Sequence, residues 1–275
     1  MTRDSTISRR DILASIGAVG LLAGGPRVAR ALRGEPPFTR YTYAQTTESG
    51  PDLRVAWYER YNGVVVEESN ALTGGPALDN TSDSFNDSGD AGRFVDRTGP
   101  DAVDAGPVLS IPNAQPGDDG LLVVGLRAED ADARVWLAVT ASEFAENGVN
   151  EPESKDDDTT PDVGELQEYV EVEWWYDTGR LGVGACNGVR DPTEEAVVPA
   201  GTLVEVSDAL AGGTLLDFGL VESVCIPAGS QRCLALRWRI DPSVTNVIQS
   251  DSARLDIAFA ATTCDDDANP FEGAL

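Results

Sequence analysis

The chain has 275 residues, of which 47 are acidic, 20 are basic and none is histidine. The formal net charge of −27 excludes direct binding to DNA, RNA or anionic lipid, because phosphate groups would be repelled. Hydrophobic residues make up 41% of the chain, so it can build a core and is not a disordered acidic tail. Dense carboxylates with one lysine, Lys155, are typical of a folded domain from a halophile, because about 1 M salt screens charges beyond roughly 3 Å.

The N-terminus carries an export signal. Arg9 and Arg10 belong to a twin-arginine motif. A weakly apolar stretch rich in glycine and alanine follows this motif. Ala31 ends a small-x-small sequence that predicts a cleavage site. Since the apolar stretch is too short to span a bilayer, residues 1–31 are predicted to be a signal peptide for the twin-arginine export machinery. The mature chain, with no membrane span, is then secreted or at the cell surface. The alternative is an Arg-Arg pair before a buried helix.

Residues 32–47 separate the leader from the folded domain. Phe38–Gln45 reads FTRYTYAQ, a β-prone segment that leader removal would free. A segment of this kind can add a strand to an open sheet edge of another copy, so it is a candidate donor strand. The alternative is that it forms the first strand of its own domain.

Residues 48–264 read as short strands separated by turn signals. The predicted strands are residues 53–59, 63–68, 107–111, 121–127, 134–141, 169–176, 234–240 and 255–261. Asn62 and Gly63 predict a tight hairpin between the first two strands. Leu203, Val206 and Leu210 lie at helical spacing and predict one short helix.

This pattern predicts an all-β fold, a jelly-roll-like antiparallel β-sandwich with one short helix and long acidic loop insertions. An acidic tail, residues 265–275, follows the sandwich. The alternative is two small β-domains that divide near residue 150. Residues 73–106 form a long polar insertion, predicted to be a surface loop, in which Asn80 and Asn86 begin N-glycosylation sequons.

Four cysteines lie in the C-terminal third of the chain, and an exported protein favours pairing them. Four cysteines allow three connectivities. If the strands that begin at Cys233 and end at Cys264 pair about a turn near residues 247–249, their sulfurs lie nearly opposite each other. The sequence therefore favours the disulfides Cys233–Cys264 and Cys186–Cys225.

Acidic clusters raise the question of a metal site. The candidate calcium ligands are Asp156, Asp157 and Asp158 in one stretch, and Asn187, Asp191, Glu194 and Glu195 in another. Neither stretch has the spacing of a calcium-binding loop, so no cofactor is expected, with calcium as the alternative. Residues 147–166 are then a solvated loop between two core strands.

The lack of histidine removes most hydrolase mechanisms, including a Ser-His-Asp triad and a His-based zinc site. A carboxylate pair of the glycosidase type is the remaining catalytic chemistry, but no pair stands out among 47 acids. Trp136, Trp174 and Trp175 can line a sugar platform, although aromatic residues in strands usually pack in the core. The alternative function is therefore an extracellular protein that binds carbohydrate or acts on polysaccharide.

Several segments in order resemble a known family. They are PNAQPGDDG, ENGVNEPESKDDDTTPDVGELQEYVEVEWWYDTG, GTLVEVSDAL and CLALRWRIDPSVTNVIQSDSARLDIAFAATTC. Together, over residues 107–264, they are similar to exported haloarchaeal proteins of the camelysin/TasA group, which have signal peptides of the SipW-dependent type. The segment after the leader departs from the family pattern, so the twin-arginine route is the expected one.

The resemblance implies a secreted jelly-roll domain. In the TasA branch such domains assemble into extracellular fibres by donating an N-terminal strand to the next subunit. The camelysin branch carries a metallopeptidase label, which does not transfer to a chain without histidine or a zinc motif. The expected function is therefore a non-enzymatic surface or matrix protein, with self-assembly into fibres.

Overall fold

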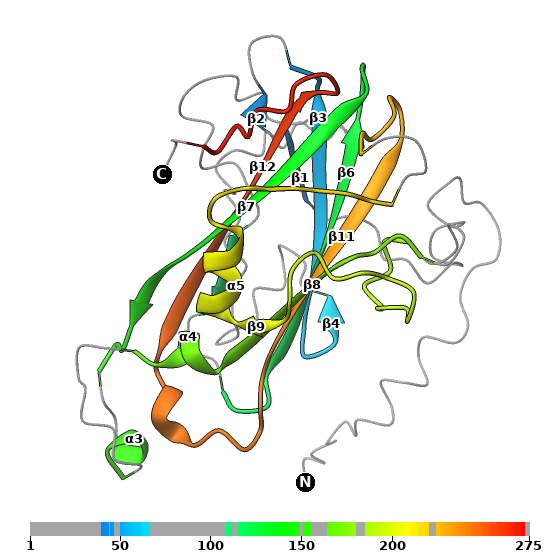
Figure 1. Ribbon diagram of the computed structural model, residues 1–275. Helices are drawn as coiled ribbons and strands as arrows, with labels where there is room; N and C mark the ends of the chain where they lie inside the picture. The colour runs from blue at the N-terminus through cyan, green and yellow to red at the C-terminus, as the bar shows by residue number, and fades with distance from the viewer. Residues whose placement is uncertain are drawn as a thin grey trace, which may run out of the picture. The chain divides into compact units, whose positions relative to one another are not determined.

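The computed structural model describes residues 40–43, 45–46, 50–65, 108–111, 115–148, 151–155, 164–179, 185–219 and 224–272. The chain divides into two units, Met1–Pro37 and Phe38–Leu275, and every described residue lies in the second unit. The described residues form two β-sheets, here called sheet A and sheet B (Figure 1).

Sheet A has seven strands in the order β1-β3-β6-β11-β8-β9, with β4 also paired to β3. Its strands are β1 (Arg40–Tyr43), β3 (Leu53–Tyr61), β4 (Val64–Val65), β6 (Asp119–Ala128), β8 (Val170–Tyr176), β9 (Gly201–Thr202) and β11 (Gln231–Ile240). All of these pairs are antiparallel.

Sheet B has five strands in the order β10-β7-β12-β2, with β5 also paired to β12. Its strands are β2 (Gln45–Thr46), β5 (Val108–Ile111), β7 (Ala133–Ala145), β10 (Thr214–Leu215) and β12 (Ser252–Thr263). Only β2 runs parallel to its neighbour; the other pairs in this sheet are antiparallel.

The two sheets pack face to face over one core. Val55 and Trp57 of β3, Leu137 of β7 and Leu255 of β12 belong to the same buried cluster. Each sheet contains strands from before and after residue 150, and they pair directly: β6 with β11 in sheet A, and β7 with β12 in sheet B. The described strands therefore form one β-sandwich, and the prediction of an all-β sandwich is confirmed. The jelly-roll order of its strands stays a prediction.

Each of the eight predicted strands corresponds to a strand of the structure, because apolar residues alternate with polar ones. In β11, Leu234 and Leu236 are buried in the core, whereas Arg237 and Arg239 are exposed. The predicted hairpin is also present: β3 pairs with β4 on either side of Asn62 and Gly63, which both have positive φ. Positive φ at two successive residues is the backbone geometry that an Asn-Gly turn provides.

The predicted helix is α5 (Leu203–Leu210). It begins with a capping box, in which the Thr202 side chain accepts from the Glu205 amide and the Glu205 carboxylate accepts from the Thr202 amide. The helix contacts β7 of sheet B and β8 of sheet A, so it closes one side of the sandwich (Figure 1). Among the described residues, three further short helical segments were not predicted: α3 (Glu151–Lys155), α4 (Leu166–Tyr169) and the 3₁₀ turn η4 (Asn246–Ile248).

The predicted pairing of the last two long strands is wrong. β11 pairs with β6 and β8 in sheet A, whereas β12 pairs with β7, β5 and β2 in sheet B. The connection between them contains η4, whose Ile248 is fully buried and belongs to the sandwich core. The chain therefore crosses from one sheet to the other there, where the sequence pattern predicted a turn.

The predicted disulfides are consequently wrong as well. The structure pairs Cys186 with Cys233 and Cys225 with Cys264, instead of Cys186–Cys225 and Cys233–Cys264. Cys233 lies in sheet A and Cys264 directly follows β12 of sheet B, so their sulfurs are not neighbours. All four cysteines are nevertheless in disulfides, as expected.

Candidate functional site

One side of the sandwich is closed by the first described residues of the chain. β1 pairs with β3 from Arg40 opposite Trp57 to Tyr43 opposite Arg54, and β2 then pairs with Ala260 and Ala261 of β12. We call β1 and β2 together the N-terminal strap. The strap contributes an edge strand to each sheet, and its pairing uses backbone groups, which any copy of the same segment can supply. It overlaps the segment predicted as a candidate donor strand. In this structure it takes the place that the alternative predicted, as the first strand of its own domain.

The opposite side is closed by β9, α5 and β10, here called the internal closure. β9 pairs with β8 of sheet A and β10 pairs with β7 of sheet B. Between them, Ser207 of α5 covers the edge of β7: its Oγ accepts from the Ala141 amide at 2.7 Å and donates to the Val139 carbonyl at 3.5 Å. The side chain thus takes the place of a neighbouring strand, which blocks further pairing at that edge.

Three carboxylates gather where the ends of the predicted acidic loop meet a distant turn. Oxygen atoms of Glu146, Glu165 and Asp251 lie within 4.8 Å of one another, and Glu146 and Asp251 are buried. Asn147 brings the segments together, because its side-chain amide donates to the Ser250 carbonyl at 2.9 Å. Asp251 Oδ2 in turn accepts from the Glu165 amide at 2.7 Å.

Carboxylate oxygens are the ligands that calcium takes in proteins, so this group is the described set with the geometry to hold a hard cation. The sequence did not single it out, because its members come from three separated positions rather than one acidic run. The predicted ligands Asp156, Asp157 and Asp158 lie outside the described residues. Residues 147–166 are also less loop-like than expected, since α3 contains the fully buried Glu153 and contacts η4.

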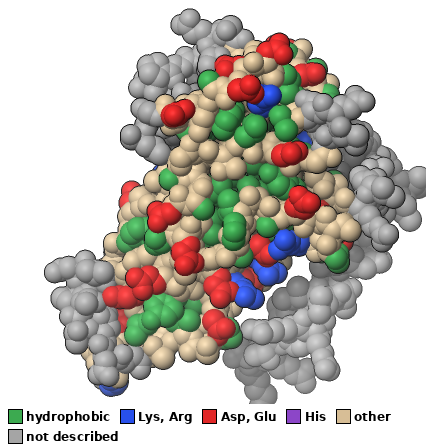
Figure 2. Space-filling model, in the orientation of Figure 1, with side chains coloured by type: hydrophobic (Ala, Val, Ile, Leu, Met, Phe, Trp, Pro, Cys, Tyr) green, Lys and Arg blue, Asp and Glu red, His purple; other side chains and the backbone are tan. Residues whose placement is uncertain are grey.

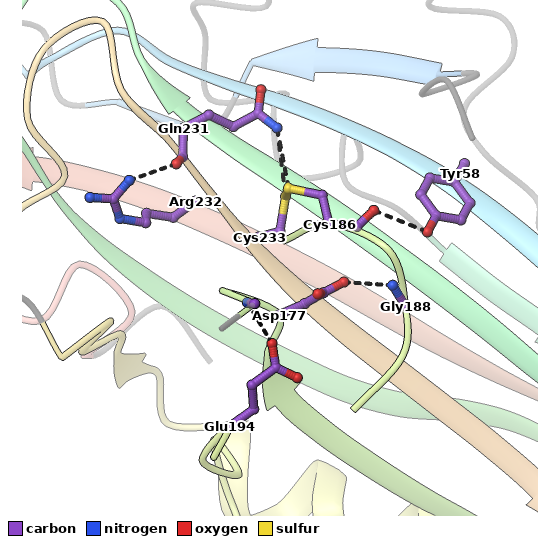
Figure 3. Close-up of a disulfide and its surroundings, with 9 residues drawn as sticks. Tyr58, Asp177, Cys186, Gly188, Glu194, Gln231, Arg232 and Cys233 are labelled. Carbon is purple, nitrogen blue, oxygen red and sulfur yellow. Dashed lines mark hydrogen bonds between the residues drawn. A yellow bond between two sulfur atoms is a disulfide. The ribbon is translucent and has the colours of Figure 1, made fainter. Parts of the chain in front are cut away.

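The second predicted calcium set has a different role. Asp191 and Glu194 do lie together, but the Glu194 carboxylate accepts from the Gly179 amide at 2.7 Å and the Asp191 amide at 2.8 Å. Glu194 is buried and holds two backbone segments in place. Figure 3 shows its carboxylate beside Asp177. The Glu194 oxygens are thus already used as hydrogen-bond acceptors, and calcium at this position stays a prediction.

A buried aspartate lies beside this anchor. Asp177 follows β8 directly, its side chain is fully buried, and its Oδ2 accepts from the Gly188 amide at 2.7 Å (Figure 3). The pKa of Asp177 is raised to about 6: burial is the largest cause, the nearby charge of Glu194 adds to it, and backbone donors such as Gly188 act in the opposite direction. Sequence reasoning missed this residue, because only burial distinguishes it from the exposed acids.

The three tryptophans proposed for a sugar platform lie on three different surfaces. Trp174 is in the sandwich core, and Trp175 belongs to a second buried cluster on the outer face of sheet A. Trp136 points away from the core residues of β7, on the outer face of sheet B. They do not form one aromatic surface.

Acidic side chains are scattered over the face that Figure 2 shows, whereas the basic side chains gather in few places. Among the described residues, no helix is long and apolar enough to cross a membrane. The predicted signal residues Arg9, Arg10 and Ala31, and the sequons at Asn80 and Asn86, lie outside the described residues. No protein-family model and no curated protein matches this chain.

Proposed function

We propose that this chain is a non-enzymatic structural protein of a halophile, exported to the cell surface or the extracellular matrix, that assembles by exchanging its N-terminal strap between copies. The observation that carries the proposal is the position of the strap, which supplies the outer strand next to β3 in sheet A and next to part of β12 in sheet B. Cleavage after Ala31, as the leader predicts, would place the strap near a free end of the mature chain.

Exchange follows from the chemistry of sheet edges. Without the strap, the backbone groups of Arg54–Trp57 would form an open edge that accepts any strand of matching sequence. The strap of a second copy offers the same register and the same hydrogen bonds. Exchange between copies therefore changes the free energy per subunit little and needs no new contact. If each subunit donates its strap to the next, the series of subunits does not close on itself and would grow into a fibre.

Two other features support export. Both pairs of cysteines form disulfides, which persist in oxidising compartments outside the cytosol. The composition, with 47 acidic residues and 20 basic ones, suits a protein that works in concentrated salt. The resemblance to the camelysin/TasA group points to the same setting.

The test compares mature protein, residues 32–275, with a variant that lacks residues 32–46. In molar salt, we expect electron microscopy to show fibres of the mature protein, and sedimentation to show folded monomers of the shortened variant. A synthetic peptide of residues 38–46 should bind the shortened variant at one peptide per chain, whereas a peptide of the same residues in scrambled order should not. Mature protein that stays monomeric at every concentration and salt would refute the proposal.

A further inference from the structure

The outer face of sheet A carries a second buried apolar surface. Each of its members is at most 9% exposed, although none faces the sandwich core. The residues are Ala56, Tyr58, Leu121, Val123, Trp175, Cys233 and Ala235. On the same face, further along β11, Arg237 and Arg239 are exposed, as expected for the outer face of a sheet. The apolar part of this face is therefore covered by another segment of the chain.

That segment is residues 185–194, here called the lid. Gly188 lies directly on the apolar surface: a Cβ added there would come within 2.4 Å of Leu121 Cδ2 and 2.9 Å of Val123 Cγ2. The φ of Gly188 is also positive, at +70°. Tyr58 adds a hydrogen bond from its hydroxyl to the Cys186 carbonyl at 3.2 Å. Only glycine fits this position, which shows how closely the lid approaches the sheet.

One covalent bond joins the lid to sheet A, the disulfide between Cys186 of the lid and Cys233 of β11 (Figure 3). Besides the Tyr58 contact, the Cys186 amide donates to the Asp177 carbonyl at 3.1 Å, and Arg190 pairs with Glu173 of β8. Two buried carboxylates also anchor the lid: Asp177 accepts from Gly188, and Glu194 accepts from Gly179 and Asp191. These carboxylates are near enough for the charge of Glu194 to act on Asp177. The closed lid thus brings two like charges together away from water, which opposes closure.

We propose that the Cys186–Cys233 disulfide is a redox latch, which holds the lid over the apolar surface of sheet A when oxidised and releases the lid when a dithiol reduces it. Closure of a flexible segment costs conformational entropy, and the disulfide removes much of that cost by tying the lid to β11. After reduction, the repulsion between Asp177 and Glu194 and the entropy of residues 185–194 both favour the open lid.

The surroundings of the sulfurs suit exchange with a thiol. Cys233 is 1% exposed, whereas Cys186 is partly exposed, so an external thiolate attacks Cys186 Sγ. The S–S bond breaks and Cys233 leaves as a thiolate. The amide of Gln231, whose Nε2 lies 3.6 Å from Cys233 Sγ, can donate a hydrogen bond to this thiolate. The second thiol of the reductant then displaces Cys186, so that two protons and two electrons reach the cysteines and the reductant becomes a disulfide.

The latch has a use that rests on the proposed export. Twin-arginine export carries chains that have already folded, so this chain would fold in a reducing compartment with its thiols free. The lid would then be open before export and would close when an oxidant outside the cell forms the disulfide. The apolar surface would be accessible only in the chain that has not yet left the cell.

The second disulfide provides the matched control. Cys225–Cys264 joins the segment before β11 to the end of β12, and neither cysteine belongs to the lid. The experiment uses the mature chain and two double variants, Cys186→Ser with Cys233→Ser, and Cys225→Ser with Cys264→Ser. Hydrogen exchange reports on the amides of Gly179, Gly188 and Asp191, and a hydrophobic dye reports on exposed apolar surface.

In the variant without the latch, we expect about tenfold faster exchange or more at these three amides, together with stronger dye binding, while the β7 and β12 amides stay protected. The variant without Cys225–Cys264 should keep the lid closed, and adding a dithiol to it should open the lid. This second variant also keeps the test decisive if the latch variant does not fold, because the latch is then its only disulfide. Lid amides that stay protected after reduction, or a lid that opens only when both sheets unfold, would overturn the proposal. Monomeric wild-type protein would refute strap exchange and leave the latch intact.

Discussion

The two sides of the sandwich are closed in different ways. On one side the internal closure buries three apolar residues of α5, Leu203, Val206 and Leu210, and its Ser207 replaces a strand at the edge of β7. On the other side the N-terminal strap pairs four residues with β3 and two with β12. The internal closure is part of the core, whereas the strap adds backbone pairing at the edges.

This difference decides which side can exchange. The chain leads into the internal closure from β8 and leaves it toward β11. Another copy therefore cannot replace the internal closure without unfolding the domain. The strap follows the predicted cleavage site and can leave both sheets together without disturbing the order of the other strands. Stability should therefore depend on one side and assembly on the other.

The largest effect is expected from Leu210→Ala in the internal closure. Leu210 is fully buried against the core, so removing its side chain leaves a cavity and should lower the free energy of unfolding by about 2–5 kcal/mol. Denaturant unfolding at constant salt measures the change. The matched control is Asp208→Ala on the exposed face of the same helix, for which a loss within about 0.5 kcal/mol is expected. Equal losses would show that burial of α5 against the core is not what makes the internal closure stabilising.

The next effect concerns Asp177, at the end of β8. Because its folded pKa is raised to about 6 from 3.8, the folded chain binds more protons than the unfolded chain between these values. The stability contribution is therefore present below about pH 4 and is lost as pH rises through about 6. Asp177→Asn should stabilise the protein at pH 7 by up to about 3 kcal/mol and change little at pH 4, as pH-dependent denaturant unfolding can measure.

The control for that prediction is Asp241→Asn. The Ser243 hydroxyl and amide donate to the exposed Asp241 carboxylate and lower its pKa, so the same substitution there should not stabilise the protein at pH 7. A gain at both positions, or a gain at Asp177 that is the same at pH 4 and pH 7, would show that burial of its charge is not the cause.

A smaller effect is expected from Ser207→Ala. The substitution removes the hydroxyl that accepts a hydrogen bond from the partly buried Ala141 amide at the edge of β7, and such a lost hydrogen bond costs about 1 kcal/mol or more. Hydrogen exchange of the Ala141 amide should become faster, while the amides of β11 keep their protection. An unchanged Ala141 amide would mean that Ser207 does not cover this edge.

The capping box should contribute less. Thr202→Ala removes the side chain that accepts from the Glu205 amide at 3.3 Å and should cost about 1 kcal/mol in denaturant unfolding. Thr202→Ser keeps an acceptor and should restore most of the loss. If serine and alanine are equally destabilising, the hydroxyl contact is not what stabilises the start of α5.

The last prediction changes no residue. Strands at the edge of a sheet open locally more readily than strands with a neighbour on each side. Amides of the strap should therefore exchange with solvent faster than those of β8, which lies between β11 and β9, at equal intrinsic rates. Assembly should slow the exchange of strap amides, because a strap donated to another copy needs both subunits to separate. If the strap amides of the monomer undergo hydrogen exchange only when the whole domain unfolds, the contrast between the two sides is contradicted.

Local patterns predicted most of the elements. β8 alternates Val170, Val172 and Trp174 with Glu171 and Glu173, and this alternation places it at the correct residues. Strands of two residues, such as β9 and β10, could not be predicted, because two residues carry no period. They form where α5 holds the chain against β8 and β7.

Pairing and site geometry depend on contacts that no local pattern contains. Cys233 lies near the start of β11 and Cys264 directly follows the end of β12, which suggested a hairpin, yet the buried Ile248 lies where the chain crosses to the other sheet and the two cysteines are separated. The carboxylates of Glu146, Glu165 and Asp251 meet for a similar reason, because Asn147 joins the end of β7 to residues 250–252. An acidic run such as residues 156–158 suggests a metal site from the sequence, but the run does not indicate which carboxylates the fold buries.

The sequence by itself determined the all-β class, the places of the long strands and of α5, and the full pairing of the cysteines, because these depend on residue type and on periods of two or 3.6 residues. Only the tertiary structure decided which strands share a sheet, which cysteines pair, how each side of the sandwich is closed and which acids are buried. Those outcomes depend on distances between residues far apart in the chain, and such distances are set by the packing of one shared core.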